Sequence, residues 1–396
     1  MKRTYLDHAS TSPILPEVAG GMGGHLTLPL NASSVHTEGQ RARALLEGAR
    51  EEVADALGLP PAEVVFTSGA SESNNLAIRG FAEARRALAR PLLIALSALE
   101  HSCVREACTA LETTGRAELR WLPVTSEGQT VPPRELGQDS GGQPVPDLLC
   151  LMAVQNETGV IQPLDEARRW RNETGCLWLC DATQAIAVRE EPLAAIGADL
   201  VSLSSHKIGG PPGVGVLAGP GIGQLLPQIS GGPQEGEKRA GTQPVAAICG
   251  FALAVRLARE RAGGHLRHLS ALEDALLSGL RRRAVPFSIN GEGVPRVSGF
   301  LNLAFPGFSG ADLVIALDGL GFAVSSGSAC ATGVMETSPV LEAMFPGDPE
   351  RASAAVRITP GSATTIEDME RLADALAGLV LRESGRGRAP GRATRP

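Results

Sequence analysis

The chain has 396 residues, of which 43% are hydrophobic and 20% charged, a composition that is typical of a folded protein of two or three domains and excludes a disordered chain. A net charge of −7 and only 3% aromatic residues argue against direct nucleic-acid binding. No run reaches the roughly 20 apolar residues of a membrane span, and Asp7 comes too early for a signal peptide, so we expect a cytoplasmic protein with no membrane partner.

From residue 38 to 220, the hydrophobic pattern predicts alternating helices and strands. A helix is expected from Gly39 to Leu57, followed by a strand at 64–67 and a second helix through Arg90. The remaining candidates in this region are strands at 92–96, 148–153, 176–180 and 200–203, and helices at 102–114 and 164–174. This alternation indicates an α/β fold with a mostly parallel sheet covered by helices on both faces.

The pattern of predicted helices and strands changes after residue 245, where we expect a smaller α+β unit. Two long helices, at 246–261 and 264–284, precede strand candidates at 301–305, 324–325 and 356–358 and helices near 310–320 and 365–382. We therefore predict a large domain over 15–255 and a small domain formed by 1–14 and 256–382. Residues 383–396 are rich in Arg, Gly and Pro and are expected to form a disordered tail.

Lys207 stands out because the chain has only three lysines among its 36 basic residues. It closes the mostly apolar run 198–207 and is followed at once by the glycine-rich run 208–213. An ε-amine can lose its proton when it is desolvated and then form a Schiff base, whereas a guanidinium remains protonated. The alternative is a surface lysine at the end of a strand.

Two further segments place polar groups at predicted strand ends. Residues 65–75 form a strand, a glycine turn and a helix start, which suits phosphate binding, although simple N-capping explains the serines equally well. Asp181 ends an apolar strand, where it could cap the next helix or pair with a protonated ring nitrogen. A phosphate cradle, a carboxylate and a Schiff-base lysine together are what pyridoxal 5'-phosphate requires.

Other polar residues follow strands in the same way. His101 could stack on a cofactor ring or relay protons, or merely be structural, and Asn156 could bond the cofactor's phenolic oxygen or serve a turn. Arg357 could bind a substrate carboxylate, with a surface ion pair as the alternative.

Cys330 lies among small and hydroxylated residues, which suits a reactive thiol on a mobile loop, although a surface cysteine without a role is also possible. The seven cysteines contain no CxxC pair, so we expect neither disulfides nor a metal site.

These segments resemble the cysteine desulfurases, in the class V aminotransferase family of fold type I pyridoxal phosphate enzymes. The resemblance spans nearly the whole chain and looks like the long-loop type that supplies sulfur for iron–sulfur clusters or tRNA thiolation. The motifs that carry it are Tyr5–Ala9, Asn31–His36, Thr67–Asn74, Asn156–Gly159, Asp181–Gln184, Ser204–Lys207 and Ser325–Cys330.

The resemblance implies a role for each matching residue. Lys207 would link the cofactor, Asp181 would pair with its ring nitrogen, and His101 would stack on its face and assist proton transfer. Cys330 would accept the sulfur. The resemblance further implies that Ala70, Ser71, Ser204 and His206 hold the phosphate of the cofactor. Asn156 and Gln184 would contact the side of the ring that carries the oxygen. Asn31, Asn156 and Arg357 would bind the substrate.

The expected reaction converts L-cysteine to L-alanine and leaves a persulfide on Cys330 for delivery to a sulfur-acceptor protein. The family also implies a homodimer in which Thr242 reaches the other subunit's phosphate. The alternatives are a selenocysteine lyase, a class V aminotransferase, or a catalytically silent subunit of an assembly.

Overall fold

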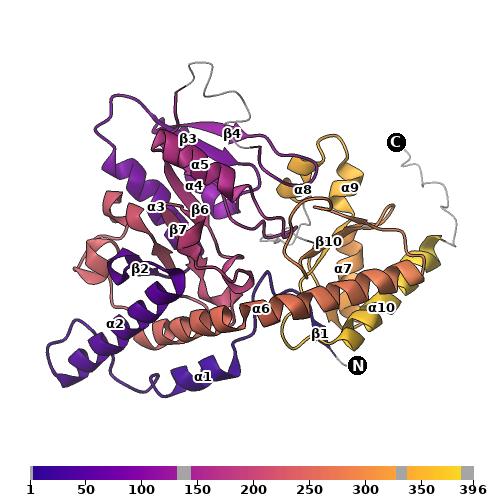
Figure 1. Ribbon diagram of the computed structural model, residues 1–396, viewed down its shortest axis with the longest axis horizontal. Coiled ribbons are helices and arrows are strands. Elements are labelled where there is room, and N and C mark those ends of the chain that lie inside the picture. The colour runs from indigo at the N-terminus through magenta and orange to yellow at the C-terminus, as the bar shows by residue number, and fades with distance from the viewer. Residues whose placement is uncertain (1–2, 132–143, 327–336, 385–396) are drawn as a thin grey trace, which may run out of the picture.

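The computed structural model describes residues 3–131, 144–326 and 337–384 (Figure 1). Its largest feature is a seven-stranded sheet in the order β2-β8-β7-β6-β5-β3-β4. Neighbouring strands from β4 to β7 are parallel, whereas β8 is antiparallel to both β7 and β2, so the predicted mostly parallel sheet is confirmed. The strands are β2 (Val64–Thr67), β3 (Leu92–Ser97), β4 (Ala117–Leu122), β5 (Leu148–Cys150), β6 (Leu177–Asp181), β7 (Leu200–Ser204) and β8 (Gly215–Ala218).

Helices cover both faces of this sheet because its strands are apolar on both sides. Alternate residues of β6 enter different clusters: Leu177 and Leu179 pack under α3 and α4, whereas Trp178 and Cys180 pack against α2, α5 and α6. The helices are α1 (Pro16–Gly23), α2 (Thr37–Leu57), α3 (Ala70–Ala84), α4 (Ser102–Thr113), α5 (Leu164–Thr174) and α6 (Val245–Arg282). The expected two-sided α/β architecture is therefore present.

Helix α6 is one continuous helix of 38 residues, so the prediction of two helices at 246–261 and 264–284 was wrong. The pair Gly263–Gly264 suggested a break, since glycine lowers helix propensity by about 1 kcal/mol. A Cβ on Gly263 would lie 2.4 Å from Oε1 of Glu190, an exposed side chain that can move aside, so packing does not require the glycine and the helix simply tolerates it. Figure 1 shows α6 running beneath the large sheet and on alongside α10. The proposed domain boundary at 255/256 falls inside α6, and the division remains a prediction.

The C-terminal part contains a three-stranded antiparallel sheet in the order β12-β10-β9 and a separate parallel pair, β1 with β11. The helix α10 continues through Ser384, so the predicted tail at 383–396 began too early, and residues 385–396 lie outside the described residues. The elements are β1 (Thr4–Tyr5), β9 (Ser288–Ile289), β10 (Leu301–Ala304), α7 (Gly310–Gly319), β11 (Phe322–Ala323), α8 (Pro339–Met344), α9 (Pro349–Ser353), β12 (Ala355–Ile358) and α10 (Ile366–Ser384).

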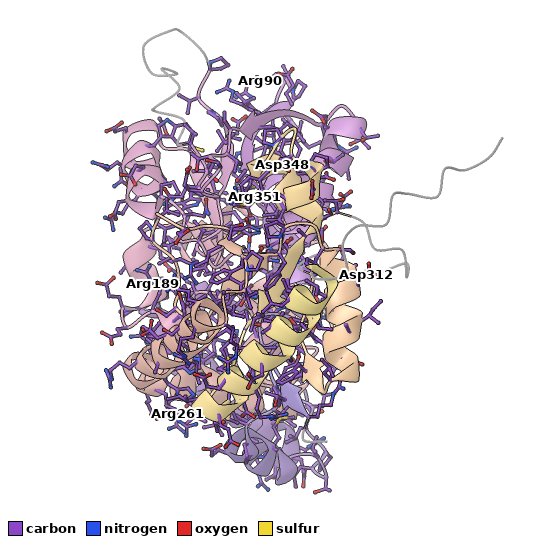
Figure 2. The ribbon with its side chains drawn as sticks, turned by 90° about the vertical axis from the view of Figure 1, so that its right-hand side faces the viewer. Arg90, Arg189, Arg261, Asp312, Asp348 and Arg351 are labelled. Carbon is purple, nitrogen blue, oxygen red and sulfur yellow. The ribbon has the colours of Figure 1, made fainter. Side chains whose placement is uncertain are left out.

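Charged side chains lie around the periphery of the molecule. Figure 2 shows Arg90, Arg261 and Asp312 at its edges, and all three are exposed. Within the described ranges, no helix combines the length and the apolar character that crossing a bilayer requires.

A buried ion pair attaches the loop 231–243 to the large sheet. The carboxylate of Glu235 accepts two hydrogen bonds from Arg50, at 2.7 and 3.0 Å, and one each from the Phe66 backbone N–H and the Gln243 amide. The Glu235 side chain is fully buried. Because Arg50 also donates to the Val64 carbonyl, the loop is held against the start of β2.

Replacing Glu235 by alanine should leave the Arg50 guanidinium buried without its main partner. We expect Glu235→Ala to lower the free energy of unfolding by about 3–5 kcal/mol, measured by chemical denaturation. Glu260→Ala is the matched control, because the Glu260–Arg256 pair is half exposed and should contribute no more than about 1 kcal/mol. Equal losses in the two variants would contradict this account of the loop.

Candidate active site

A cavity of about 1010 Å³ lies at the carboxyl ends of the parallel strands, between the large sheet and β12. Ligand sites in sheets of this type occur at that edge. Ten of the residues predicted from the sequence line it: Ala70, Ser71, His101, Asn156, Asp181, Gln184, Ser204, His206, Lys207 and Arg357. The structure thus brings together side chains that are up to 287 positions apart in the chain (357 − 70).

One wall of the cavity is the turn between β2 and α3. Gly69 precedes the helix with a φ of 154°, and no side chain caps the first turn of α3, so the N-capping alternative for the serines is wrong. A Cβ on Gly215 of β8 would lie 2.5 Å from Gly69 Cα, which shows how closely the two backbones approach. With Ser71, Ser204 and His206 beside it, this uncapped helix start is a suitable place for a phosphate group.

Lys207 lies in the short 3₁₀ turn that follows β7, and its ammonium group meets the N-terminal segment. Its Nζ donates hydrogen bonds to the carbonyls of Ala9, at 2.7 Å, and Ser10, at 2.6 Å. Burial, together with the charge of Arg357, lowers the pKa of Lys207 from 10.5 to about 8. Burial also lowers the pKa of His206 to about 4, so this ring is neutral near pH 7.

Asp181 ends β6 with its carboxylate facing the cavity, and only 8% of the residue is exposed. Oδ1 accepts a hydrogen bond from the Thr183 backbone N–H at 3.0 Å, and Oδ2 accepts one from the Asn74 amide at 2.8 Å. The carboxylate therefore supports the local turn and lines the cavity. It does not cap the next helix, the 3₁₀ turn Ile186–Val188, which begins after Ala185 with no side-chain cap, so the capping alternative is wrong. The hydroxyl of Thr183 is buried with no partner among the described residues.

His101 is both structural and part of the cavity wall. It precedes α4, and its Nδ1 accepts a hydrogen bond from the Cys103 backbone N–H at 3.2 Å. Burial, more than the nearby charge of Lys207, lowers the pKa of the imidazole. A neutral ring whose Nδ1 accepts a hydrogen bond carries its proton on Nε2.

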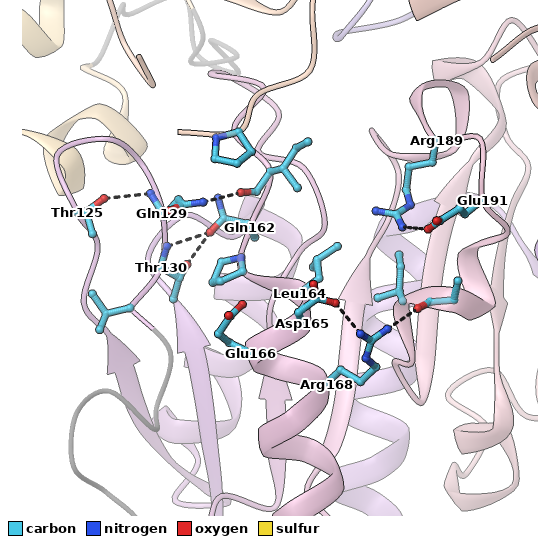
Figure 3. Close-up of a pocket in the computed structure, with 16 residues that line it drawn as sticks. Thr125, Gln129, Thr130, Gln162, Leu164, Asp165, Glu166, Arg168, Arg189 and Glu191 are labelled. Atoms are coloured by element: carbon cyan, nitrogen blue, oxygen red, sulfur yellow. Dashed lines mark hydrogen bonds and ion pairs between the residues drawn. The ribbon is translucent and has the colours of Figure 1, made fainter. Parts of the chain in front are cut away.

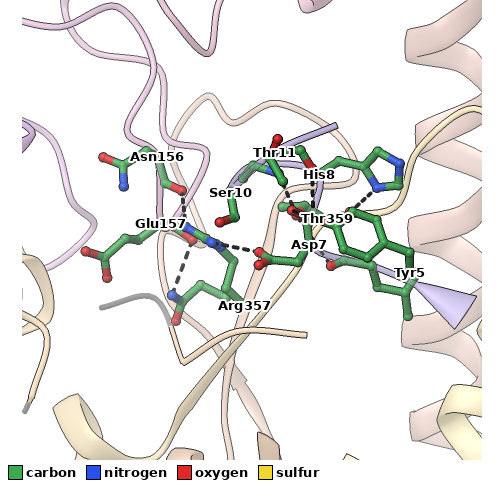
Figure 4. A network of polar contacts seen from close by, with 12 residues as sticks. Tyr5, Asp7, His8, Ser10, Thr11, Asn156, Glu157, Arg357 and Thr359 are labelled. Atoms are coloured by element: carbon green, nitrogen blue, oxygen red, sulfur yellow. Dashed lines mark hydrogen bonds and ion pairs between the residues drawn. The ribbon is translucent and has the colours of Figure 1, made fainter. Parts of the chain in front are cut away.

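Arg357 comes from β12 and faces the other elements across the cavity (Figure 4). Nη2 pairs with the Asp7 carboxylate at 2.7 Å, and Nη1 donates to the Asn156 carbonyl at 3.0 Å. Only 4% of Arg357 is exposed, so the ion pair is buried and the alternative of a surface pair is wrong. Nε is buried and has no partner among the described residues, which leaves a donor for an anionic ligand.

Two predicted residues do not line this cavity, and a third falls outside the described residues. Asn31 and Thr242 are exposed and lie outside the cavity's lining. They belong to segments that meet through Gln234, which donates to the Ser33 hydroxyl and accepts from the Gly241 N–H. Cys330 lies outside the described residues, although Ser325 and Thr337, on either side of the undescribed stretch 327–336, both line the cavity.

A second cavity, of about 830 Å³, contains none of the predicted residues (Figure 3). Its charged side chains pair mainly with one another, as Arg168 does with Asp165 and Arg189 with Glu191. The first cavity is therefore the better candidate for chemistry.

Several side chains at the site were not singled out from the sequence. Asp7 and Asn74 hold predicted residues, and Cys103 contacts His101. Glu100 is buried, and burial raises its pKa to about 8, so it is protonated near neutral pH. The available signal was position alone: Glu100 directly precedes His101, and Asp7 and Asn74 lie within motifs of the family resemblance.

Comparison with known proteins agrees with this geometry. The family model described as Aminotransferase class-V matches residues 4–372. The cysteine desulfurase IscS of Dictyoglomus turgidum is 36% identical over 382 residues, which cover 96% of this chain and 95% of the relative. A solved NifS-like protein superposes with a TM-score of 0.86 at 30% identity, covering 96% of this chain and 100% of that protein.

A further similar structure is SspA in complex with cysteine, with a TM-score of 0.77 at 29% identity, covering 91% of this chain and 100% of SspA. The site suits pyridoxal phosphate: the cavity offers an amine, a carboxylate and an uncapped helix start, and buried polar atoms of Thr183 and Arg357 have no partner among the described residues. The chain therefore belongs to the pyridoxal phosphate-dependent class V aminotransferase family, among its cysteine desulfurases.

Proposed function

We propose that this protein converts L-cysteine to L-alanine and transfers the sulfur atom to the Cys330 thiol, which becomes a persulfide. The observation that carries the proposal is the presence of Lys207, Asp181 and Arg357 in one cavity. The reaction balances, because the sulfur that leaves Cβ is replaced there by hydrogen and is inserted between the Cys330 sulfur and its proton.

When bound, pyridoxal phosphate supplies an electron-withdrawing ring that weakens the bonds around the substrate's Cα and Cβ. Lys207 would link the cofactor and later move a proton at Cα, and the Asp181 carboxylate would pair with the ring nitrogen. His101 would stack on the ring face and present its Nε2 proton to the reacting groups. The phosphate would be held by Ala70, Ser71, Ser204 and His206, and the ring oxygen by Asn156 and Gln184.

Arg357 would bind the substrate carboxylate. Its free Nε and its forked geometry suit a carboxylate, and burial strengthens such a contact. Asn156, whose carbonyl accepts from Arg357, would help to orient the amino acid. Asn31 does not line the cavity of its own chain. It would therefore contact the substrate only from outside that cavity.

The positions of Asn31 and Thr242 support a homodimer. Both are exposed and lie outside their own cavity, and the loop that carries Thr242 is attached firmly through Glu235. In a twofold dimer, Thr242 would contact the phosphate bound by the other subunit. A rigid loop suits this role because it presents a hydroxyl at a defined position.

The sulfur would pass from Cys330 to an acceptor protein in iron–sulfur cluster assembly or tRNA thiolation. A reducing, cytoplasmic setting fits the six cysteines in the described residues, all of which are free. Incubation with pyridoxal phosphate and L-cysteine, followed by measurement of alanine, keto acid and bound sulfane sulfur, distinguishes a desulfurase from an aminotransferase. The same incubation with L-selenocysteine distinguishes a selenocysteine lyase from a silent subunit.

The lowered pKa of Lys207 predicts the pH range in which the lysine can link the cofactor. An amine must be unprotonated to attack an aldehyde, so the linkage rate should rise with pH around a midpoint near 8 instead of 10.5. Stopped-flow absorbance of pyridoxal phosphate mixed with cofactor-free protein measures this rate. Lys207→Arg should not link at any pH, and Lys238→Arg, whose side chain donates to the Leu225 carbonyl and does not line the cavity, should behave as wild type. A midpoint above about 10 would contradict the effect of burial.

Arg357→Gln should raise KM for L-cysteine about tenfold or more, because hydrogen bonds to a charged carboxylate are lost. Steady-state alanine formation measures KM, and thermal melting checks the fold, since Asp7 loses its partner in this variant. Arg256→Gln is the surface control and should leave KM unchanged. An unaltered KM in Arg357→Gln would remove the assignment.

Cys330→Ser should bind pyridoxal phosphate as wild type does, yet form no protein persulfide from L-cysteine. The reason is that a hydroxyl cannot accept sulfane sulfur. Mass spectrometry of the intact protein after incubation with L-cysteine measures the added sulfur atom. Cys249→Ser should keep the persulfide, whereas full sulfur transfer by Cys330→Ser would refute the role of Cys330.

A further inference from the structure

The side-chain amide of Asn74 contacts two of the groups that surround the proposed cofactor ring. Asn74 lies near the start of α3 and is fully buried, with 0% exposure. Its Nδ2 donates to Asp181 Oδ2 at 2.8 Å and to the Cys103 sulfur at 3.3 Å. The two hydrogens of one nitrogen therefore reach side chains from β6 and α4.

The orientation of this amide follows from electrostatics. If the amide were turned over, its oxygen would face the Asp181 carboxylate, and two acceptors would repel each other. Nδ2 must therefore point to Asp181. The amide oxygen of Asn74 then has no partner among the described residues, and a buried acceptor without a donor reduces stability. The unpaired oxygen is a cost to the fold that the hydrogen bond from Nδ2 to the Asp181 carboxylate offsets.

The second contact continues to His101. The Cys103 sulfur lies 3.1 Å from Nδ1 of His101 and also lines the cavity. Burial raises the pKa of the Cys103 thiol to about 11, so the thiol keeps its proton. A ring nitrogen that accepts the Cys103 backbone N–H carries no proton, so the protonated thiol is the donor in its contact with Nδ1, and the N–H and S–H groups share that one lone pair. A directed chain thus runs from the Asn74 amide through the Cys103 thiol to the His101 ring.

We propose, on the basis of the function proposed above, that Asn74 is a positioning residue. Through one branch it fixes the Asp181 carboxylate so that its remaining lone pairs face the ring nitrogen of the cofactor. Through the other branch, with Cys103 as the link, it holds the His101 imidazole with Nε2–H toward the cavity. One buried amide thereby sets both the partner of the ring nitrogen and the group on the ring face.

The test uses Asn74→Leu, which keeps the approximate size of the side chain but removes both hydrogen bonds. We expect the dissociation constant for pyridoxal phosphate to rise about tenfold or more, the size expected when hydrogen bonds around a charged group are lost. The pH midpoint of the absorbance of the Lys207-linked cofactor should also rise. We expect this rise because the ring nitrogen of the cofactor would lose its proton when the Asp181 carboxylate is no longer held beside it. The ring would then no longer repel the positive charge on the nitrogen that joins the cofactor to Lys207. The melting temperature of the cofactor-free protein measures separately any loss of fold stability in this variant.

Three further variants separate the contact of Asn74 with Asp181 from its contact with His101 through Cys103. Asn74→Asp puts an acceptor beside Asp181 and should shift the pH midpoint in the same direction, which provides a second reading if Asn74→Leu folds poorly. Cys103→Val should leave the midpoint unchanged but alter the Nδ1 signal of His101 in ¹⁵N-histidine spectra of the cofactor-free protein, and Cys103→Ser should restore it. Cys108→Ala removes a buried thiol from the same helix and should change neither quantity.

Several outcomes would overturn the proposal. Wild-type affinity and midpoint in both Asn74 variants would do so, whether or not the melting temperature falls, because Asn74 would then support only the fold. A proton on Nδ1 of His101 would refute the second branch. A wild-type protein that takes up no pyridoxal phosphate would overturn the proposed function itself, whereas normal uptake with unaffected variants would overturn only the role of Asn74.

Discussion

The contact between the N-terminal segment 5–12 and two cations is the interaction on which the cavity depends. The carbonyls of Ala9 and Ser10 accept hydrogen bonds from Lys207, and the carboxylate of Asp7 pairs with Arg357. The segment begins in β1, which pairs with β11 in the C-terminal part, and then crosses to the end of β7. A short stretch of backbone thus holds a residue of the large sheet and a residue of the small sheet at one site.

Burial decides the charges in this cavity. It lowers the pKa of Lys207 and His206 and raises that of Glu100, so each group moves toward its neutral form. Near pH 7 the His206 imidazole and the Glu100 carboxyl are therefore neutral, whereas Lys207, with a pKa of about 8, is still mostly protonated. Arg357 contributes a guanidinium group to the same cavity. A site with a neutral imidazole and a neutral carboxyl group beside the cations of Lys207 and Arg357 is suited to receive the negative charges of a phosphate and an amino-acid carboxylate.

Local pattern was sufficient for the elements whose residues are apolar over a full strand or helix. The strands around β3, β6 and β7 and the helices α2, α4 and α5 lie close to their predicted ranges because both faces of the sheet are buried. The edge strand β4 and the short β8 were missed, since a half-exposed edge and a four-residue strand beside glycines give weak signals. The helix α3 ends at Ala84, earlier than the predicted Arg90, and the predicted strand at 324–325 lies two residues before, at β11.

The residue types and their order along the chain determined, without coordinates, the family, the parallel sheet, and the lysine, aspartate and arginine expected at the site. Strand ends can be read from a one-dimensional pattern because each end follows its own apolar run. Only the tertiary structure showed that Asp7 neutralises Arg357, that Asn74 joins Asp181 to Cys103, and that Asn31 and Thr242 lie outside their own chain's cavity. These contacts join residues from different elements, up to 350 positions apart, and local periodicity carries no information about such pairs.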